Sequence, residues 1–237
     1  MSSGIYIAAG GAVAQSNALD ATANNIANAT TAGFHGDRVT FREAMTQAKS
    51  VDMAAVGAGT SRVDSQAGAL SQTGNPLDLA LEGDGYFSVQ TKDGARYTRA
   101  GNFRLDDSRQ LVTMDGNTVR GEGGAAIAIP EDAKQISIGV DGEVFADEES
   151  VGKLELTRFA SKSLKREGST LFAAKGAPEA GDAPKVRSGM LEASNVNVVR
   201  GVVDLVKVSR TYESLMRVIQ SYADVESRAA RELGGPK

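Results

Sequence analysis

The stretch NVNVVRGVVDLVKVSRTYESLMRVIQSYADVESRAAR, residues 195–231, decides the fold of this chain. Apolar or small residues return in it at alternating steps of four and three, and charged residues such as Lys207 and Arg217 lie between them. This spacing keeps one face of an α-helix apolar, and no glycine or proline interrupts it after Gly201. The pattern predicts one amphipathic helix, roughly 50 Å long at about 1.5 Å per residue. The stripe consists of Val198, Val202, Leu205, Ser209, Tyr212, Met216, Ile219 and Ala223.

A second stripe with the same spacing lies at the other end of the chain, where residues 4–28 predict the first helix. Its small residues would let another helix approach closely. One stripe alone is typical of an ordinary core helix. Two stripes at the extreme ends, on either side of a β-rich middle, favour pairing of the termini with each other or with neighbouring copies. We therefore expect an α+β protein whose long N- and C-terminal helices form a coiled-coil-like bundle. The second stripe consists of Ile5, Ala9, Ala12, Ser16, Leu19, Ala23 and Ile26.

The middle of the chain has the alternation of short β-strands. Leu77, Leu79 and Leu81 alternate with polar or small residues, which is typical of a half-buried strand. Asp-Gly pairs at 93–94, 115–116 and 141–142 are hairpin signals. Short strands separated by such turns predict a central antiparallel β domain, either a sandwich or a partial barrel. Strands are expected at 77–81, 86–91, 95–99, 101–105, 110–114, 125–129, 135–140, 152–159 and 186–191.

The residues between the first helix and the β domain show neither the helical spacing of apolar residues nor the period-two alternation of a strand. They predict an extended connector that includes a short strand or a helical turn. The sequence thus divides into an N-terminal helix at 1–30, a connector at 31–73, a central β domain at 74–190 and a C-terminal helix at 191–237.

Composition narrows the class of protein. The 237 residues can bury a core, and 41% are hydrophobic while 24% are charged. A net charge of −4 gives no general attraction to nucleic acid or to anionic membranes. Cysteine is absent, which excludes disulfides and thiolate metal sites. The N-terminus lacks the basic region of a secretory signal peptide, and no segment is long and apolar enough to span a membrane, so export would need another route.

Residues that could carry catalysis are few. His35 is the only histidine, which excludes a site built from several histidines. Adjacent acids at 106–107 and 147–149 are more typical of solvated turns than of general acid–base pairs. A small basic group could contact a phosphate, but salt-bridged strand residues or a protein interface fit it better. We therefore predict no enzyme, no catalytic or metal-binding residue and no cofactor. The basic group consists of Arg96, Arg99 and Arg104.

Several blocks of the sequence resemble bacterial flagellar rod and hook proteins. ANNIAN at 23–28 followed by TAGF at 31–34 resembles their N-terminal signature. TGNPLDLALEGDGYF at 73–87 and YTRAGNF at 97–103 resemble the start of their β domain. GMLEASNV at 189–196 resembles their return into the C-terminal helix, and RTYE at 210–213 an element within it. The blocks cover nearly the whole chain in the order of the family. The N-terminal motif residues are Ala23, Asn24, Asn25, Ala27, Asn28, Gly33 and Phe34.

The resemblance implies a structural subunit of the flagellar basal-body rod that self-assembles along the axis and transmits torque. Its length and single small β domain are most like the proximal rod proteins (FlgF-type). The alternatives are a distal rod protein of the same family and a non-flagellar β-domain binding module with dimerising helices. The expected helical seams for assembly are Ile5, Ala12, Leu19, Ile26, Val198, Val202, Leu205, Tyr212, Met216 and Ile219.

Partners and location follow from the same resemblance. The implied partners are other rod and hook subunits, like copies of the chain and the flagellar export apparatus, without nucleic acid or membrane insertion. The implied place is the periplasmic rod, reached by type III export without a cleaved signal peptide. Because alanines in the first stripe bury little area, at roughly 25 cal/mol per Å², we expect the termini to be unfolded in the free monomer and to fold on assembly.

Overall fold

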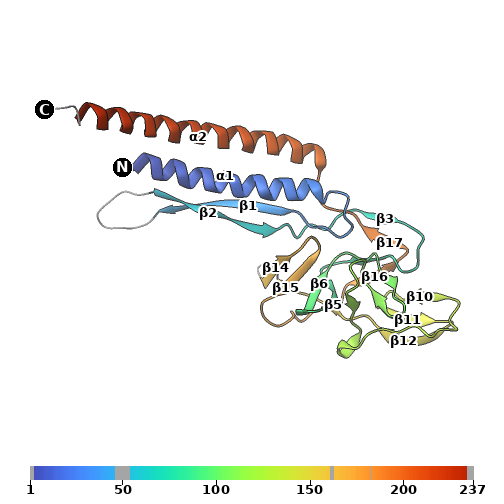
Figure 1. Cartoon of the computed structure of the whole chain (residues 1–237). Helices are drawn as coiled ribbons and strands as arrows, with labels where there is room; N and C mark the ends of the chain where they lie inside the picture. The colour runs from blue at the N-terminus through green and yellow to red at the C-terminus, as the bar shows by residue number, and fades with distance from the viewer. Residues whose placement is uncertain (1–2, 46–53, 161–162, 182, 234–237) are drawn as a thin grey trace. The chain divides into compact units, whose positions relative to one another are not determined.

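The computed structural model describes residues 3–45, 54–160, 163–181 and 183–233 (Figure 1). The chain forms two compact units. The first, which we call the helical unit, comprises Met1–Ala27, Asp37–Arg62 and Asn197–Lys237. The second, which we call the β unit, comprises Asn28–Gly36 and Val63–Val196.

Two long helices build the helical unit, α1 at Ser3–Ala27 and α2 at Val198–Leu233 (Figure 1). They run antiparallel, because the start of α1 meets the end of α2. A β-carbon added to Gly4 would lie 2.8 Å from the Tyr222 hydroxyl oxygen, and one added to Gly201 would lie 2.9 Å from Ile26 Cγ1. Both helices that the periodicity predicts are confirmed, to within three residues at each end.

Asn197 explains where α2 begins. Its side-chain Oδ1 accepts a hydrogen bond from the Arg200 backbone N–H at 3.0 Å. An asparagine that satisfies a free N–H in the first turn is a favoured N-cap, so the helix starts directly after this residue.

A two-stranded sheet completes the helical unit. It pairs β1, Asp37–Met45, with β2, Ala54–Val63, and β1 lies against α1. Both strands lie in the stretch whose pattern predicts only an extended connector with a short strand or helical turn. Neither strand alternates apolar and polar residues throughout, and this alternation is the signal from which a strand is predicted.

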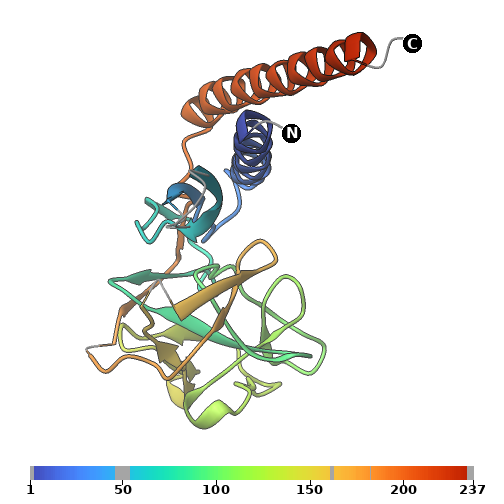
Figure 2. The same ribbon diagram turned by 90° about the vertical axis from the view of Figure 1, so that its left-hand side faces the viewer.

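The β unit consists of short antiparallel strands. Its largest sheet has eight strands in the order β14-β15-β6-β5-β9-β8-β7, with β13 also paired to β5. A three-stranded sheet, β10-β11-β12, and the pairs β16-β4 and β17-β3 complete it (Figure 2). The elements are β3 Leu70–Gln72, β4 Leu79–Glu82, β5 Tyr86–Thr91, β6 Gly94–Thr98, β7 Arg104–Leu105, β8 Leu111–Val112, β9 Thr118–Val119, the 3-10 turn η1 Glu122–Gly124, β10 Ile136–Ile138, β11 Glu143–Ala146, β12 Glu149–Lys153, β13 Leu156–Thr157, β14 Leu164–Glu167, β15 Leu171–Ala174, β16 Lys185–Ser188 and β17 Met190–Glu192.

The predicted α+β class with a central antiparallel β domain is confirmed. The strand expected at 86–91 is β5, and the Asp-Gly turn at 93–94 joins it to β6, with Gly94 at φ 106°. The segment 125–129 contributes only isolated bridges to its neighbours. The pattern did not predict β14 or β15, or β11, whose turn into β12 uses Asp147 and Glu148 at positive φ without a glycine.

One main hydrophobic core holds the β unit together. It draws on β4, β5, β10, β11 and β16, and Phe87 packs edge-on against Phe103 with ring centroids 5.1 Å apart. A smaller cluster gathers around Phe172, which is fully buried and packs against Tyr86. The core residues include Leu79, Leu81, Phe87, Val89, Phe103, Leu111, Val119, Ile127, Ile129, Ile138, Val144, Leu154 and Val186.

Candidate assembly interface and chain junction

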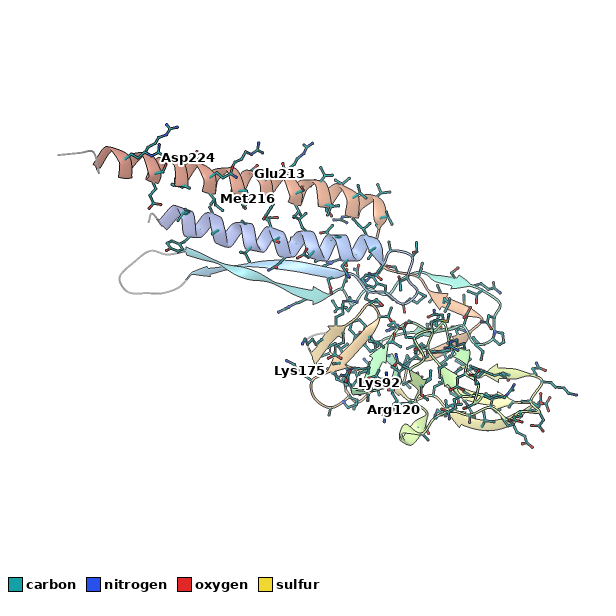
Figure 3. All side chains as sticks on the ribbon, viewed as in Figure 1. Lys92, Arg120, Lys175, Glu213, Met216 and Asp224 are labelled. Carbon is teal, nitrogen blue, oxygen red and sulfur yellow. The ribbon has the colours of Figure 1, made fainter. Side chains whose placement is uncertain are left out.

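The stripe of α2 is only half covered in the single chain. Leu205, Tyr212, Met216 and Ile219 are half-buried, whereas Glu213, on another side of the helix, is exposed (Figure 3). Toward the start of α2 the stripe emerges into solvent, since Val198 and Val202 are 44% and 46% exposed. These two residues join an apolar surface that we call the valine patch. It consists of Val198, Val199, Val202, Val203 and Val206.

The seam residues of α1 show the same mixture. Ala12 is buried, and Ile5, Leu19 and Ile26 are half-buried. Gly11 approaches α2 closely, because a β-carbon there would lie 3.4 Å from a methyl group of Leu215. The absence of a side chain at Gly11 therefore lets the two helices approach closely at this point.

The remaining surface of α1 has almost no charge. Asp20 is the only charged residue among Ser3–Ala27, although many side chains of this helix are exposed. Tyr6, Ile7 and Val13 are large and exposed, Val13 by 55%. A helix with so few charges around its circumference is typical of one surrounded by protein, so its exposed sides and the valine patch form a candidate interface for other subunits.

The family motif lies where the chain passes between its two units. Asn25 binds the backbone of Asp37 in both directions, since its Nδ2 donates to Asp37 O and its Oδ1 accepts from Asp37 N, each at 2.8 Å. These two hydrogen bonds tie the end of α1 to the start of β1. Asn28 Oδ1 pairs with Thr31 Oγ1 at 3.3 Å in the following turn. The other helical members of the motif, Ala23, Asn24 and Ala27, are exposed.

Three segments of the β unit meet beside the passages between units, and we call them the junction. Gly33 N donates to Glu192 O at 2.7 Å, and Gly36 N donates to Asn195 Oδ1 at 2.7 Å. Asn195 Nδ2 donates in turn to Gln66 O at 2.8 Å. Asp64 N donates to Gly36 O at 2.8 Å, so each segment is hydrogen-bonded to the other two. The junction consists of residues 33–36, 64–68 and 192–195.

Gly33 and Phe34 are both buried in the junction. Gly33 has φ 65°, and a β-carbon on it would lie 2.2 Å from the Ala100 backbone nitrogen. Phe34 is fully buried, and the guanidinium of Arg166 lies over its ring at 4.7 Å from the centroid. Close packing and the left-handed backbone both require glycine at position 33.

A buried cluster of polar and charged side chains lies at the centre of the junction. His35 Nε2 is 2.9 Å from Glu192 Oε1, and Arg99 Nη1 is 3.2 Å from Glu192 Oε2. Gly68 N also donates to Glu192 Oε1 at 2.8 Å. Burial raises the pKa of Glu192, but the hydrogen bond from His35, the charge of Arg99 and the Gly68 N–H outweigh it and hold that pKa below its usual value. Glu192 is therefore an ionised carboxylate that joins three segments.

The acids considered for acid–base chemistry serve turns instead. Asp106 Oδ1 accepts from the backbone of Ser108 and of Gln110, at 2.9 and 2.8 Å. Asp147 accepts from the backbone N–H groups of Lys134 and Gln135. Among the residues that the structure describes, no three acid or histidine side chains are grouped to hold a metal ion. In the same part of the chain, no helix is long and apolar enough to cross a membrane.

The basic group does not form one surface. Arg96 pairs with Glu167, Arg99 with buried Glu192, and Arg104 is exposed on β7. Two of the three are thus salt-bridged strand or strand-end residues.

Models of three related families match the chain in order along its length. Residues 5–35 match the flagella basal body rod protein, 80–146 the flagellar hook protein FlgE/F/G D1 domain, and 187–232 the flagellar basal body rod FlgEFG protein C-terminal region. FlgF, the flagellar basal-body rod protein of Salmonella typhimurium, is 37% identical over 97% of both chains. FlgF of Rhizobium meliloti is 30% identical over the whole of both chains. FlgG of Bacillus subtilis is 35% identical over 87% of this chain and 90% of its own.

The chain belongs to the flagellar basal-body rod protein family. It is accordingly a structural subunit of the rod and not an enzyme. The relatives do not support the alternative of a non-flagellar binding module. The three matched regions of this rod protein include α1 with the first segment of the junction, much of the β unit, and α2 with the last segment of the junction.

The sequence pattern did not predict the buried cluster of His35, Arg99 and Glu192 in this rod protein. His35 stood out only as the single histidine of the connector, and Glu192 only as one letter of the block at 189–196. A signal was present, because Glu192 falls inside one block that resembles the family and His35 directly follows another. Their pairing across 157 positions, however, becomes visible only in the folded chain.

Proposed function

We propose that this protein is the proximal, FlgF-type subunit of the rod. The matches to FlgF proteins extend over 240–248 aligned positions and cover 97–100% of both chains. The matches to FlgG of Agrobacterium fabrum and Caulobacter vibrioides need 262 aligned positions, and thus longer insertions against a chain of 237 residues. These lengths favour the proximal subunit. The distal subunit is the alternative, since FlgG of Bacillus subtilis also matches at 35% identity.

Self-assembly through the helical unit is the mechanism we infer, and the nearly uncharged surface of α1 carries the inference. Exposed apolar side chains on α1 and in the valine patch of α2 gain free energy when other helices cover them, at roughly 25 cal/mol per Å². Neighbouring subunits that supply those helices would form a coiled-coil-like bundle. Interlocked helices resist twisting better than flexible linkers do, as the transmission of torque requires.

The seam residues keep their proposed role in this bundle. We infer that Leu205, Tyr212, Met216 and Ile219 support the pairing within the chain and that Val198 and Val202 contact other subunits. On α1, Ile5, Ala12, Leu19 and Ile26 take the corresponding positions. The division into parts at 1–30, 31–73, 74–190 and 191–237 remains a proposal of the same kind.

The β unit would form a sandwich or partial barrel. One hydrophobic core receives residues from three separate sheets, for example Phe87, Val144 and Val186. Sheets that share one core face each other, and this favours a closed or sandwiched arrangement.

We further infer that the protein lies in the periplasmic part of the basal body and leaves the cytoplasm through the flagellar type III export apparatus. Copies of itself and adjacent rod and hook subunits are the proposed partners. The family of the chain supports this location, because its relatives are flagellar basal-body rod proteins.

The experiment that tests the position uses the absence of cysteine. A Met114→Cys variant would carry one reactive thiol at a side chain that is 59% exposed, and the unsubstituted chain would be the unlabelled control. Hook–basal bodies purified from cells with this variant are labelled with a thiol-reactive gold particle and imaged. We expect label near the inner-membrane end of the rod, at a few copies.

The other outcomes have definite meanings. Label farther along the axis at higher copy number would assign the protein to the distal rod. Label absent from the axial structure, in cells where the variant is exported and motile, would overturn the proposal.

A further inference from the structure

Two buried nitrogen atoms of the β unit lack a hydrogen-bond partner in the part of the chain that the structure describes. They are Nε of Arg99 and Nε of Arg158. Arg99 is 4% exposed and uses its other two nitrogens to bind Glu192 Oε2 at 3.2 Å and Gly83 O at 2.7 Å. The guanidinium of Arg158 has no acceptor among the described residues. Because buried donors are rarely left unpaired in proteins, these two nitrogens indicate an acceptor from outside the chain.

Both arginines line one cavity within the β unit. Its volume is about 200 Å³, so it can hold a group of several atoms and not only one water molecule. Ser65, Tyr86 and Phe159 line it as well, and Arg99 Cζ lies 5.4 Å from the centroid of the Tyr86 ring. The two unpaired nitrogens therefore belong to residues that surround a space large enough for a ligand.

The charges around the cavity indicate which ligand it accepts. Guanidinium groups bind carboxylates and phosphates through paired N–H groups. Buried Glu192 already balances the charge of Arg99, so only the charge of Arg158 is left without a counter-ion. Asp84 and Glu179 also line the cavity and are exposed, and their carboxylates repel a doubly charged phosphate more strongly than a singly charged ligand. The balance of charge favours a carboxylate.

We propose that this cavity binds one carboxylate group, which accepts hydrogen bonds from Arg158 and from Nε of Arg99. The carboxylate belongs either to a small organic acid or to an acidic side chain of a neighbouring subunit, and its chemistry at the arginines is the same in both cases. The site lies within the β unit and does not depend on the position of the protein in the rod.

Titration of the ¹⁵N-labelled full-length protein with acetate tests the site. Sodium acetate replaces sodium chloride at constant ionic strength and pH 7.0, and a second titration uses inorganic phosphate. We expect saturable shifts of the backbone amide signals of Gly85 and Ala160, which line the cavity, and weaker binding of phosphate than of acetate. Shifts that do not saturate would show that water alone satisfies the arginines and would overturn the proposal. Binding of phosphate as tight as that of acetate would exclude a carboxylate site.

Two matched variants separate this site from a general attraction of anions. Arg158→Gln removes the guanidinium that has no counter-ion, and we expect acetate to bind about tenfold more weakly or less. Arg104→Gln removes the same charge from an exposed position of β7 outside the cavity, and we expect unchanged affinity. Equal affinities in the two variants would overturn the proposal.

The fold of Arg158→Gln should persist, because the replaced guanidinium bonds to no described residue. If this variant does not fold, Arg158→Lys takes its place. Lysine keeps the charge but lacks the paired N–H groups, so we again expect weaker binding of acetate. Undiminished binding in the lysine variant would contradict recognition by the guanidinium.

Motility identifies the source of the carboxylate. If an acidic side chain of another subunit occupies the cavity, cells with Arg158→Gln should swim poorly although the purified variant is folded, and cells with Arg104→Gln should swim normally. If a small organic acid occupies it, both strains should swim normally while only Arg158→Gln loses affinity for acetate.

Discussion

Gly33 leaves no room for a side chain, and this gives a prediction at the scale of one residue. The Gly33→Ala change places a β-carbon 2.2 Å from the Ala100 nitrogen, on a backbone with φ 65°. Since both the clash and the left-handed conformation oppose folding, we expect the free energy of unfolding to fall by more than about 2 kcal/mol. Urea unfolding of the full chain measures it.

Gly74 is the matched control for that change. It has φ 77°, but nothing lies within 4 Å of an added β-carbon. Gly74→Ala should therefore lower the free energy of unfolding only by the cost of placing alanine in the left-handed backbone conformation, about 1 kcal/mol. Equal losses in the two variants would show that the contact with Ala100 does not matter.

Glu192 predicts a loss of stability in acid. Its pKa is lower in the folded protein than in the unfolded chain, so it contributes stability above the unfolded value, about 4.3, and loses it as the pH falls through the folded value. We expect the urea concentration at the unfolding midpoint of the unsubstituted protein to decrease once the pH drops below about 4. Glu192→Gln should be less stable at pH 7 and respond less to acid. An identical acid response in both proteins would exclude this role for Glu192.

The pairing of α1 with α2 is tested at the scale of the element. Leu205→Asp or Tyr212→Asp places a charge on the half-buried side of α2. Because burying an unpaired charge is costly, we expect either change to abolish rod assembly and motility while the β unit stays folded. Swimming in soft agar and thermal unfolding of the purified protein measure the two effects.

Gln220→Asp is the control for both charge substitutions. It introduces the same residue at an exposed position of the same helix, so helix propensity changes comparably while no half-buried contact is lost. We expect it to remain motile. Normal swimming in Leu205→Asp and Tyr212→Asp cells would show that this face of α2 is not a seam.

Elements with a complete local signal could be predicted from the sequence. The alternating steps of four and three locate α2 to within three residues, and alternation followed by Asp-Gly locates β5 and β6. Where a strand lacks such a signal the prediction failed. The turn from β11 to β12 places Asp147 and Glu148 at φ 49° and 74°, a conformation usually marked by Gly or Asn.

At the scale of the whole molecule, the two units should differ in stability when the protein is free. The main core and buried junction stabilise the β unit by themselves, whereas α1 and α2 leave large apolar side chains exposed. We expect low helicity by circular dichroism and a protease-resistant fragment close to 63–196, with the helices folding on assembly. Limited trypsin digestion followed by mass spectrometry identifies that fragment. A fully helical monomer whose α2 resists trypsin would contradict this expectation.

The sequence by itself determined the two terminal helices, the β-rich middle and membership of the rod family, because periodicity, turn residues and motif blocks are local properties of the chain. Only the tertiary structure decided how His35, Arg99 and Glu192 meet, and which sides of α1 and α2 stay uncovered. The reason is that burial and charge pairing depend on residues far apart in the chain. Nothing in the local sequence around residue 35 or residue 192 indicates that His35 Nε2 and Glu192 Oε1 lie 2.9 Å apart in the folded chain.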